Sequence, residues 1–198
     1  MMLYSASLGV RSHSVRIVLL EKEVECRVEY VDSEGAPGDL VELNPYNETP
    51  TLVDRDLVLY GCQIINEYLD ERLPHPPLMP VDPVNRGRAR LMMLRVQRDW
   101  LDLVKDFDSV ELVRENEDAR QMIRDGLIAV SPIFNEQAYM LGEEFSLVDC
   151  LMAPLLWRLP VYGINLPRQA KPILEYGERL FERASFLSSL SEAEHEIR

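Results

Sequence analysis

Six side chains of this sequence are of the types that most often act as nucleophiles or metal ligands. They are Cys26, Cys62, Cys150, His13, His75 and His195. The cysteines are far apart and odd in number, which argues against both a disulfide framework and a clustered thiolate metal site. No two histidines have the spacing of a helical zinc site. We therefore predict reduced thiols and no bound metal.

Cys62 has the clearest chemical role to offer, because it stands at the start of a predicted helix. A helix dipole stabilises a thiolate at that end, which would suit a redox sensor. However, no CxxC pair and no neighbouring histidine accompany Cys62 in the sequence. A free cysteine is more often a small buried apolar residue, and we predict that role for Cys62, Cys26 and Cys150.

The segment LPHPPLMP, residues 73–80, places His75 among four prolines. Proline fixes its own backbone angle and lacks an amide donor, so the segment is expected to form a stiff connector between two helices. The same stiffness leaves little conformational entropy to lose on binding, which also suits a docking surface around His75. From the residues alone, the connector is the favoured interpretation.

The composition is typical of an ordinary globular protein. The chain has 198 residues, of which 46% are hydrophobic, enough for one core or for two small domains packed together. It has no apolar run of membrane-spanning length and no signal peptide at its start, so we expect a cytoplasmic protein. Its formal net charge is -13, a sign that repels phosphate backbones, and we expect no direct binding to nucleic acid.

Two regions of different periodicity follow one another along the chain. The first has an apolar start, an amphipathic segment from Ser12, an alternating segment over 25–31 and the short runs TLVD and LVLY. This pattern predicts the order β-α-β-(α)-β-β-α. From Val84 the strand patterns disappear and helical periods replace them. We predict an α/β domain at 1–73, a proline-rich connector at 74–83 and an all-helical domain at 84–198.

The helix expected from Val84 to Lys105 carries six basic residues and two acidic ones, a local charge of +4. These charges could speed the approach of an acidic partner, or they could neutralise the acidic segment 106–118 that follows. The sequence leaves both interpretations open. The apolar residues of the same helix are expected to be mostly core, with one edge available to a partner subunit: Leu91, Leu94, Trp100 and Leu101.

Two motifs carry a resemblance to a known fold. Thr49-Pro50 precedes the third predicted strand, where a cis proline would be a specified feature. Ser146 and Asp149 have the spacing of a helix capping box. Together with the order of elements, these motifs resemble the glutathione S-transferase fold over essentially the whole chain. The resemblance implies a thioredoxin-like N-terminal domain, an all-helical C-terminal domain and a two-fold dimer.

A closer resemblance is to the stringent starvation protein A family, a branch of that fold that binds RNA polymerase. The segments TPTLVDRDL, EYLDERLPHPPLMP, FSLVDC, APLLWRLP and SEAEHEIR look like the signature segments of that family, in the same order. The resemblance implies that Pro74, His75, Pro76 and Pro77 form a surface that engages RNA polymerase holoenzyme. Asp82 departs from the aromatic residue that relatives carry there.

The residues that the resemblance aligns with the glutathione site have lost their chemistry. The position that holds a hydroxyl or thiol in the transferases falls on Gly9, and the Glu-Ser pair that binds the γ-glutamyl group falls on Gly61-Cys62. Thr49-Pro50 remains and could hold a peptide-like ligand through its backbone. We therefore expect a homodimeric transcription regulator with no catalytic residue and no cofactor.

Two alternatives stay open. One is a glutathione-dependent transferase or thiol reductase that uses Cys62 or one of the nearby serines, Ser7, Ser12 or Ser14. These serines are favoured as turn and capping residues. The other is an interaction module with a different partner.

Overall fold

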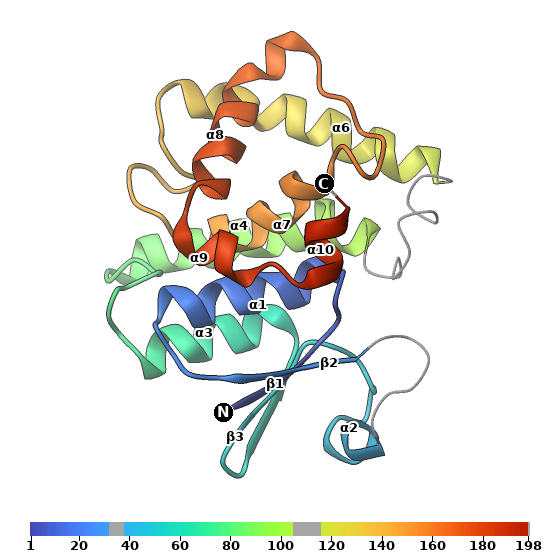
Figure 1. Ribbon diagram of the computed structural model, residues 1–198. Helices are drawn as coiled ribbons and strands as arrows, with labels where there is room; N and C mark the ends of the chain where they lie inside the picture. The colour runs from blue at the N-terminus through green and yellow to red at the C-terminus, as the bar shows by residue number, and fades with distance from the viewer. Residues whose placement is uncertain (32–37, 105–115, 198) are drawn as a thin grey trace.

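The computed structural model describes residues 1–31, 38–104 and 116–197. A mixed four-stranded sheet lies at one end of the molecule and a set of helices at the other (Figure 1). The strands are β1 (Met2–Ser5), β2 (Arg27–Tyr30), β3 (Thr51–Asp54) and β4 (Leu57–Tyr60), in the spatial order β2-β1-β3-β4. β1 is parallel to β2 and antiparallel to β3, and β3 is antiparallel to β4. The predicted thioredoxin-like domain followed by helices is confirmed.

Helices α1 (Val10–Glu21) and α3 (Cys62–Arg72) pack together on one face of the sheet, whereas the short α2 (Gly38–Leu43) lies at its edge (Figure 1). α1 begins earlier than the predicted Ser12, because Gly9 is extended and its carbonyl accepts a hydrogen bond from the His13 amide at 2.9 Å. Leu3 and Leu52 of the sheet are fully covered by this layer.

β2 is an edge strand, and its inward face is incomplete. The alternation over residues 25–31 predicts a strand with one buried face that contains Cys26, Val28 and Tyr30, but Tyr30 is 44% exposed. The guanidinium of Arg16 lies 5.6 Å from the centre of the Tyr30 ring, so a cation–π contact takes the place of burial there.

The helical part contains α4, α6, α7, α8, α9 and α10, with bounds Pro83–Asp99, Glu117–Val130, Leu147–Arg158, Lys171–Phe181, Ala184–Ser189 and Glu192–Glu196. Short 3-10 segments follow at Leu101–Leu103, Ser131–Asn135 and Arg168–Ala170. Of the four apolar residues expected to be mostly core with one edge available to a partner, Trp100 and Leu101, just after α4, are buried, whereas Leu91 and Leu94 on α4 are exposed. Within the described residues no helix has the length and apolarity needed to cross a membrane.

α7 is the buried centre of the helical part, and it starts at a capping box. The Oδ2 atom of Asp149 accepts hydrogen bonds from the Ser146 amide at 2.8 Å and from the Ser146 hydroxyl at 2.7 Å. Its Oδ1 atom accepts from the Met140 amide and from the Tyr176 hydroxyl. Burial raises the pKa of Asp149 above its usual value, because the charged form is desolvated. Ser146 and Asp149 therefore have a structural position.

A buried ionic cluster fastens the C-terminal helices to α1. The Glu194 carboxylate lies 2.6 Å from Arg16 and also pairs with Arg158 of α7. The Nε2 atom of His13 lies 2.8 Å from the Ser189 hydroxyl, which itself donates to the Phe186 carbonyl. These contacts join segments from both ends of the chain into one packed unit.

Candidate functional site

The two regions of interest lie at opposite ends of α3. Gly61 and Cys62 mark its N-terminal end, where the resemblance places part of the glutathione site. Leu73 follows its C-terminal end, where the proline-rich connector begins. One helix therefore positions both candidate sites.

The N-terminal end keeps the backbone of a ligand-binding loop. The Thr49-Pro50 peptide bond is cis, as the sequence predicts. Gly61 has φ +84° and ψ 119°, in the left-handed half of backbone space that favours glycine. Cys62 follows directly and is only 3% exposed.

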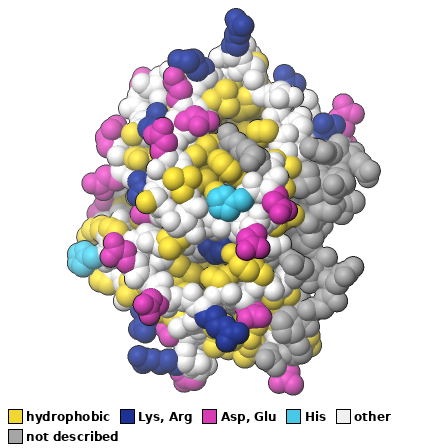
Figure 2. Space-filling model, viewed as in Figure 1, with side chains coloured by type: hydrophobic (Ala, Val, Ile, Leu, Met, Phe, Trp, Pro, Cys, Tyr) yellow, Lys and Arg dark blue, Asp and Glu magenta, His cyan; other side chains and the backbone are white. Residues whose placement is uncertain are grey.

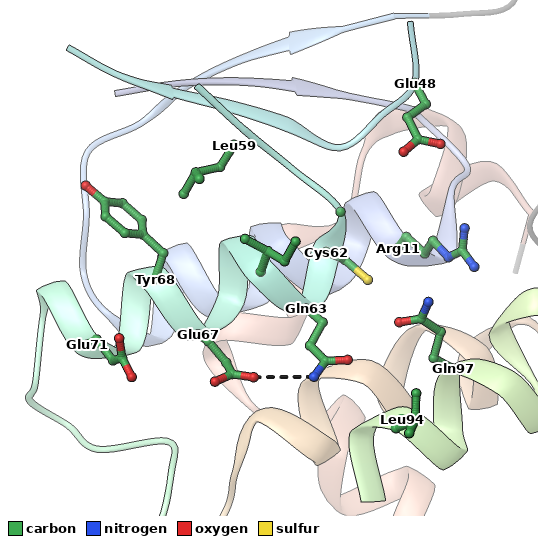
Figure 3. Close-up of a pocket in the computed structure, with 12 residues that line it drawn as sticks. Arg11, Glu48, Leu59, Cys62, Gln63, Glu67, Tyr68, Glu71, Leu94 and Gln97 are labelled. Atoms are coloured by element: carbon green, nitrogen blue, oxygen red, sulfur yellow. Dashed lines mark hydrogen bonds between the residues drawn. The ribbon is translucent and has the colours of Figure 1, made fainter. Parts of the chain in front are cut away.

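A pocket of about 720 Å³ extends along α3, from Gly61 at this end to Glu71 near the other (Figure 3). Its lining includes Arg11, Glu48, Leu59, Gly61, Cys62, Gln63, Ile64, Glu67, Tyr68, Glu71, Leu94 and Gln97. In Figure 3 the Cys62 thiol lies on the same side as Arg11 and Gln97. The Gln63 amide donates to Glu67 at 3.3 Å. We call this cavity the α3 pocket.

Cys62 has the electrostatics of an unreactive thiol. Burial raises its pKa to about 11, because desolvation outweighs the opposing effects of the Arg11 charge and the neighbouring amides. A thiolate is the reactive form of cysteine, and at neutral pH this side chain is almost entirely protonated. Among the other cysteines, Cys150 is buried and Cys26 is half-buried.

Gly9 offers no hydroxyl and leaves no room for one. A Cβ atom at this position would lie 2.9 Å from the Cβ of Ala6. The nearby Ser12 hydroxyl accepts a hydrogen bond from the Ala6 amide at 3.1 Å, and the Ser14 hydroxyl donates to the Arg11 carbonyl at 2.7 Å. Ser12 and Ser14 are buried and do not line the α3 pocket.

Glutathione needs a donor for its thiolate and a polar clamp for its γ-glutamyl carboxylate. Gly9 has no side-chain donor, and Gly61 and Cys62 have neither charge nor hydroxyl. These three positions therefore lack the side-chain groups expected to hold the two polar ends of that ligand, although the backbone of Thr49-Pro50 is in place and Arg11, Gln63 and Gln97 line the α3 pocket.

At the other end of α3, the connector presents an exposed ridge. Pro74, His75, Pro76 and Pro77 are all exposed, and we call these four residues the connector ridge. The next residues, Leu78 and Met79, are buried. The His75-Pro76 bond is cis, which the sequence did not indicate. The connector thus turns one side outward and anchors the other in the core.

Two residues that fix the connector from inside were not found from the sequence. Lys22, at the end of α1, and Asp70, on α3, are buried and form an ion pair of 2.6 Å. They are 48 residues apart in the chain. Neither has a motif around it, and a lysine at a helix end is ordinarily a solvated residue, so no sequence signal marks them.

The basic face of α4 is partly neutralised, but by α3. Arg86 pairs with Glu71 at 2.9 Å and Arg90 pairs with Glu67 at 2.8 Å. The sequence leaves open whether the basic residues neutralise the acidic segment 106–118. Residues 106–115 of that segment, and Lys105, lie outside the described residues. Figure 2 shows acidic and basic side chains interspersed, with apolar patches between them, over the face of the molecule that it views. In the part of the chain that the structure describes, no group of acidic, cysteine or histidine side chains is placed to hold a metal.

Comparison with known proteins gives two levels of similarity. Residues 10–72 match the family "Glutathione S-transferase, N-terminal domain" and residues 91–184 match "Glutathione S-transferase, C-terminal domain". The stringent starvation protein A homologue of Coxiella burnetii is 49% identical, over 100% of this chain and 95% of the relative. A probable maleylacetoacetate isomerase of Caenorhabditis elegans is 30% identical, over 83% of this chain and 81% of the relative.

Solved structures extend the likeness of fold. The crystal structure of a glutathione S-transferase from Rhodospirillum rubrum superimposes with a TM-score of 0.85 at 21% identity, covering 100% of this chain and 95% of that one.

Proposed function

The chain belongs to the stringent starvation protein A family, within the glutathione S-transferase fold, and from that membership we propose that it is a non-catalytic transcription regulator that binds RNA polymerase. The single observation that carries the proposal is the connector ridge: four consecutive residues, three of them prolines, are exposed while the residues after them are buried. The regulator acts in the cytoplasm as a homodimer.

The connector ridge has the properties of a recognition surface. Its prolines restrict the backbone before any partner arrives, so little conformational entropy is lost on binding. His75 adds a polar side chain between apolar rings, which supplies direction to an otherwise apolar contact. The acidic net charge of the chain favours a protein partner over free DNA.

The absence of catalysis rests on the other end of α3. At that end the pKa of Cys62 is raised to about 11, and Gly9, the residue before α1, supplies no side-chain donor. A polymerase-binding protein has no need of either group.

A second copy of the chain is proposed to pack on the exposed apolar residues of α3 and α4. Ile64 is 58% exposed and Leu91 is 60% exposed, and Leu94 beside them lines the α3 pocket with Ile64. Isologous contact through such a surface is the common way to a two-fold dimer. Light scattering of the purified protein should give twice the mass of the 22.9 kDa chain.

The test of polymerase binding compares two exposed histidines. The purified protein is mixed with RNA polymerase core and holoenzyme and analysed by co-elution, together with His75→Ala and the control His195→Ala on α10. We expect the wild type and the control to co-elute, and His75→Ala to bind at least tenfold more weakly, as for a residue central to an interface. Failure of the wild type to bind core or holoenzyme would refute the proposal.

The alternative is a glutathione-dependent transferase or thiol reductase, and the α3 pocket beside Cys62 is the observation that favours it. Turnover of glutathione with a generic electrophile is measured for the wild type and for Cys62→Ser. The regulator proposal expects no turnover above the uncatalysed rate. Turnover that Cys62→Ser abolishes would establish the enzyme.

A further inference from the structure

The inner side of the connector converges on one ammonium group. The Nζ atom of Lys22 donates to the Asp70 carboxylate at 2.6 Å, to the Leu73 carbonyl at 2.8 Å and to the Pro76 carbonyl. An ammonium has three donors and no acceptor. All three donors of Lys22 are therefore used, one on α3 and two on the segment that carries the connector ridge.

The connector cannot fix this shape by itself. Three of the four ridge residues are prolines, which have no amide hydrogen and so cannot donate to the carbonyls of their own turn. A carbonyl that points inward must find a donor elsewhere, because an unpaired buried carbonyl costs free energy. Lys22 supplies that donor from the C-terminal end of α1, 54 residues before Pro76 in the sequence.

Asp70 binds the same segment at Leu78, two residues after Pro76. Its Oδ1 atom accepts from the Leu78 amide at 2.8 Å as well as from Lys22. The Leu78 carbonyl in turn accepts from the Leu147 amide at 2.9 Å. The segment is thus bound at Leu73, Pro76 and on both sides of Leu78, while the side chains of the ridge itself stay free of these contacts.

A buried ion pair is a costly way to hold a loop. The Lys22 side chain is 0% exposed and that of Asp70 is 7% exposed, and desolvation of two charges commonly cancels their attraction. An apolar pair of the same volume would stabilise the core as well. It would, however, offer no donor to the Leu73 and Pro76 carbonyls.

We propose that Lys22 and Asp70 are positioning residues of the recognition surface: the buried ion pair sets the curvature of residues 73–78 and so presents His75 and its flanking prolines in one preformed arrangement. The proposal rests on the proposed function for the identity of the partner, but its structural half does not. Loss of the ammonium leaves the ridge residues present and exposed, with their arrangement no longer fixed.

The test uses Lys22→Met, Lys22→Arg and the matched control Glu21→Gln. Glu21 is the neighbouring residue on α1 and forms a comparable ion pair with Arg183 at 2.8 Å, but it bonds the C-terminal helices and not the connector. Methionine keeps the unbranched stem and removes the donors. Arginine keeps the charge, but its planar fork cannot aim donors at three converging acceptors.

Two readouts are made on the folded full-length proteins. The first is free of any partner: the NMR signals of the His75 ring and the hydrogen-exchange protection of the Leu78 amide. We expect Lys22→Met to shift and broaden the His75 signals and to lower the Leu78 protection at least tenfold, with Lys22→Arg intermediate and Glu21→Gln like the wild type. Unchanged His75 signals and protection in Lys22→Met would overturn the proposal.

The second readout is binding to RNA polymerase holoenzyme. We expect Lys22→Met to bind at least tenfold more weakly at a temperature where it is fully folded, and Glu21→Gln to bind like the wild type. Equal binding by Lys22→Met and the wild type, with the connector rearranged, would overturn the role in recognition. If the wild type does not bind, the proposed function fails, and the first readout still decides whether the ion pair shapes the connector.

Discussion

The two ends of α3 differ in the side chains that surround them. At the N-terminal end, the positions expected to bind a ligand hold Gly61 and a protonated Cys62, which lack the charge and the hydroxyl of a γ-glutamyl clamp. At the C-terminal end, Lys22 and Asp70 are buried with their hydrogen-bonding capacity directed at the connector. The side-chain groups expected to bind glutathione are absent at Gly9 and Gly61-Cys62, whereas two buried charged residues hold the connector, a segment that ordinarily only links two domains.

The difference teaches where in a shared fold to look for function. The cis Thr49-Pro50 bond and the left-handed backbone of Gly61 are present beside the N-terminal end of α3, although Gly61-Cys62 lacks the side-chain groups expected to bind glutathione. Backbone geometry alone therefore does not identify the side-chain chemistry of a site. A buried charge is better evidence, because it must be compensated by specific partners and an apolar core would serve stability equally well.

The largest expected effect is at the connector end, with Asp70→Ala. This change leaves the Lys22 ammonium buried without its counter-charge and the Leu78 amide without its acceptor. We expect a loss of about 3–5 kcal/mol in the free energy of unfolding, measured by urea denaturation. The double variant Lys22→Met/Asp70→Leu should lose clearly less, because it removes both charges. A double variant as unstable as Asp70→Ala would show that the pair contributes stability as such.

The sequence predicts the architecture far better than it predicts this pair. Alternation in TLVD and LVLY and the helical periods after Val84 are local signals, and the structure has the elements they predict. Exposure of Tyr30, Leu91 and Leu94 was missed because it depends on which neighbours cover a face, and periodicity carries no such information. Contacts between charged residues 48 positions apart, like those of Lys22 and Asp70, leave no pattern in one sequence.

The glutathione-site positions were easier to locate than to interpret. Gly9 and Gly61 were found by comparison with motifs, because an absent side chain is visible in the sequence. The crowding at Gly9 and the raised pKa of Cys62 come from packing around them, which only the structure contains.

The next effect is at the N-terminal end of α3, in the reactivity of Cys62. With a pKa of about 11, the thiolate fraction at pH 8 is lower than that of a free cysteine by about two orders of magnitude. We expect iodoacetamide to label Cys62 correspondingly slowly, with the rate rising about tenfold per pH unit up to pH 10. Mass spectrometry of the peptide containing Cys62 measures this rate, and the urea-unfolded chain is the control. Rapid labelling of Cys62 at pH 8 would contradict the interpretation of this side chain as an unreactive thiol.

The raised pKa of Cys62 also makes the free energy of unfolding depend on pH. Between the unfolded value of 9.0 and about 11 the unfolded chain loses the Cys62 proton while the folded chain keeps it. The free energy of unfolding therefore falls as pH rises through this window, and Cys62→Ala should make that fall shallower than in the wild type.

A smaller effect is expected when the missing hydroxyl is put back with Gly9→Ser. The new Cβ would approach the Cβ of Ala6 to 2.9 Å, and a side-chain atom fixed to the backbone cannot rotate away. Overpacking of this kind costs about 1–3 kcal/mol, measurable by thermal unfolding. Glutathione turnover should stay at the uncatalysed rate, because the clamp at Gly61 is still absent. Glutathione turnover by Gly9→Ser would contradict this expectation, because it would show that one added hydroxyl is enough for activity.

The smallest effect lies between the two ends, at Glu67→Gln. Glu67 pairs with Arg90 of α4 at 2.8 Å, but the Arg90 side chain is 47% exposed, so solvent screens the attraction. A pair of this kind contributes about 0.2–1 kcal/mol, and we expect a loss in that range by urea denaturation, shrinking further in high salt. Polymerase binding should be unchanged, because the connector anchors do not involve Glu67. Weaker binding by Glu67→Gln would instead place the α3–α4 face, with its exposed arginines, within the recognition surface.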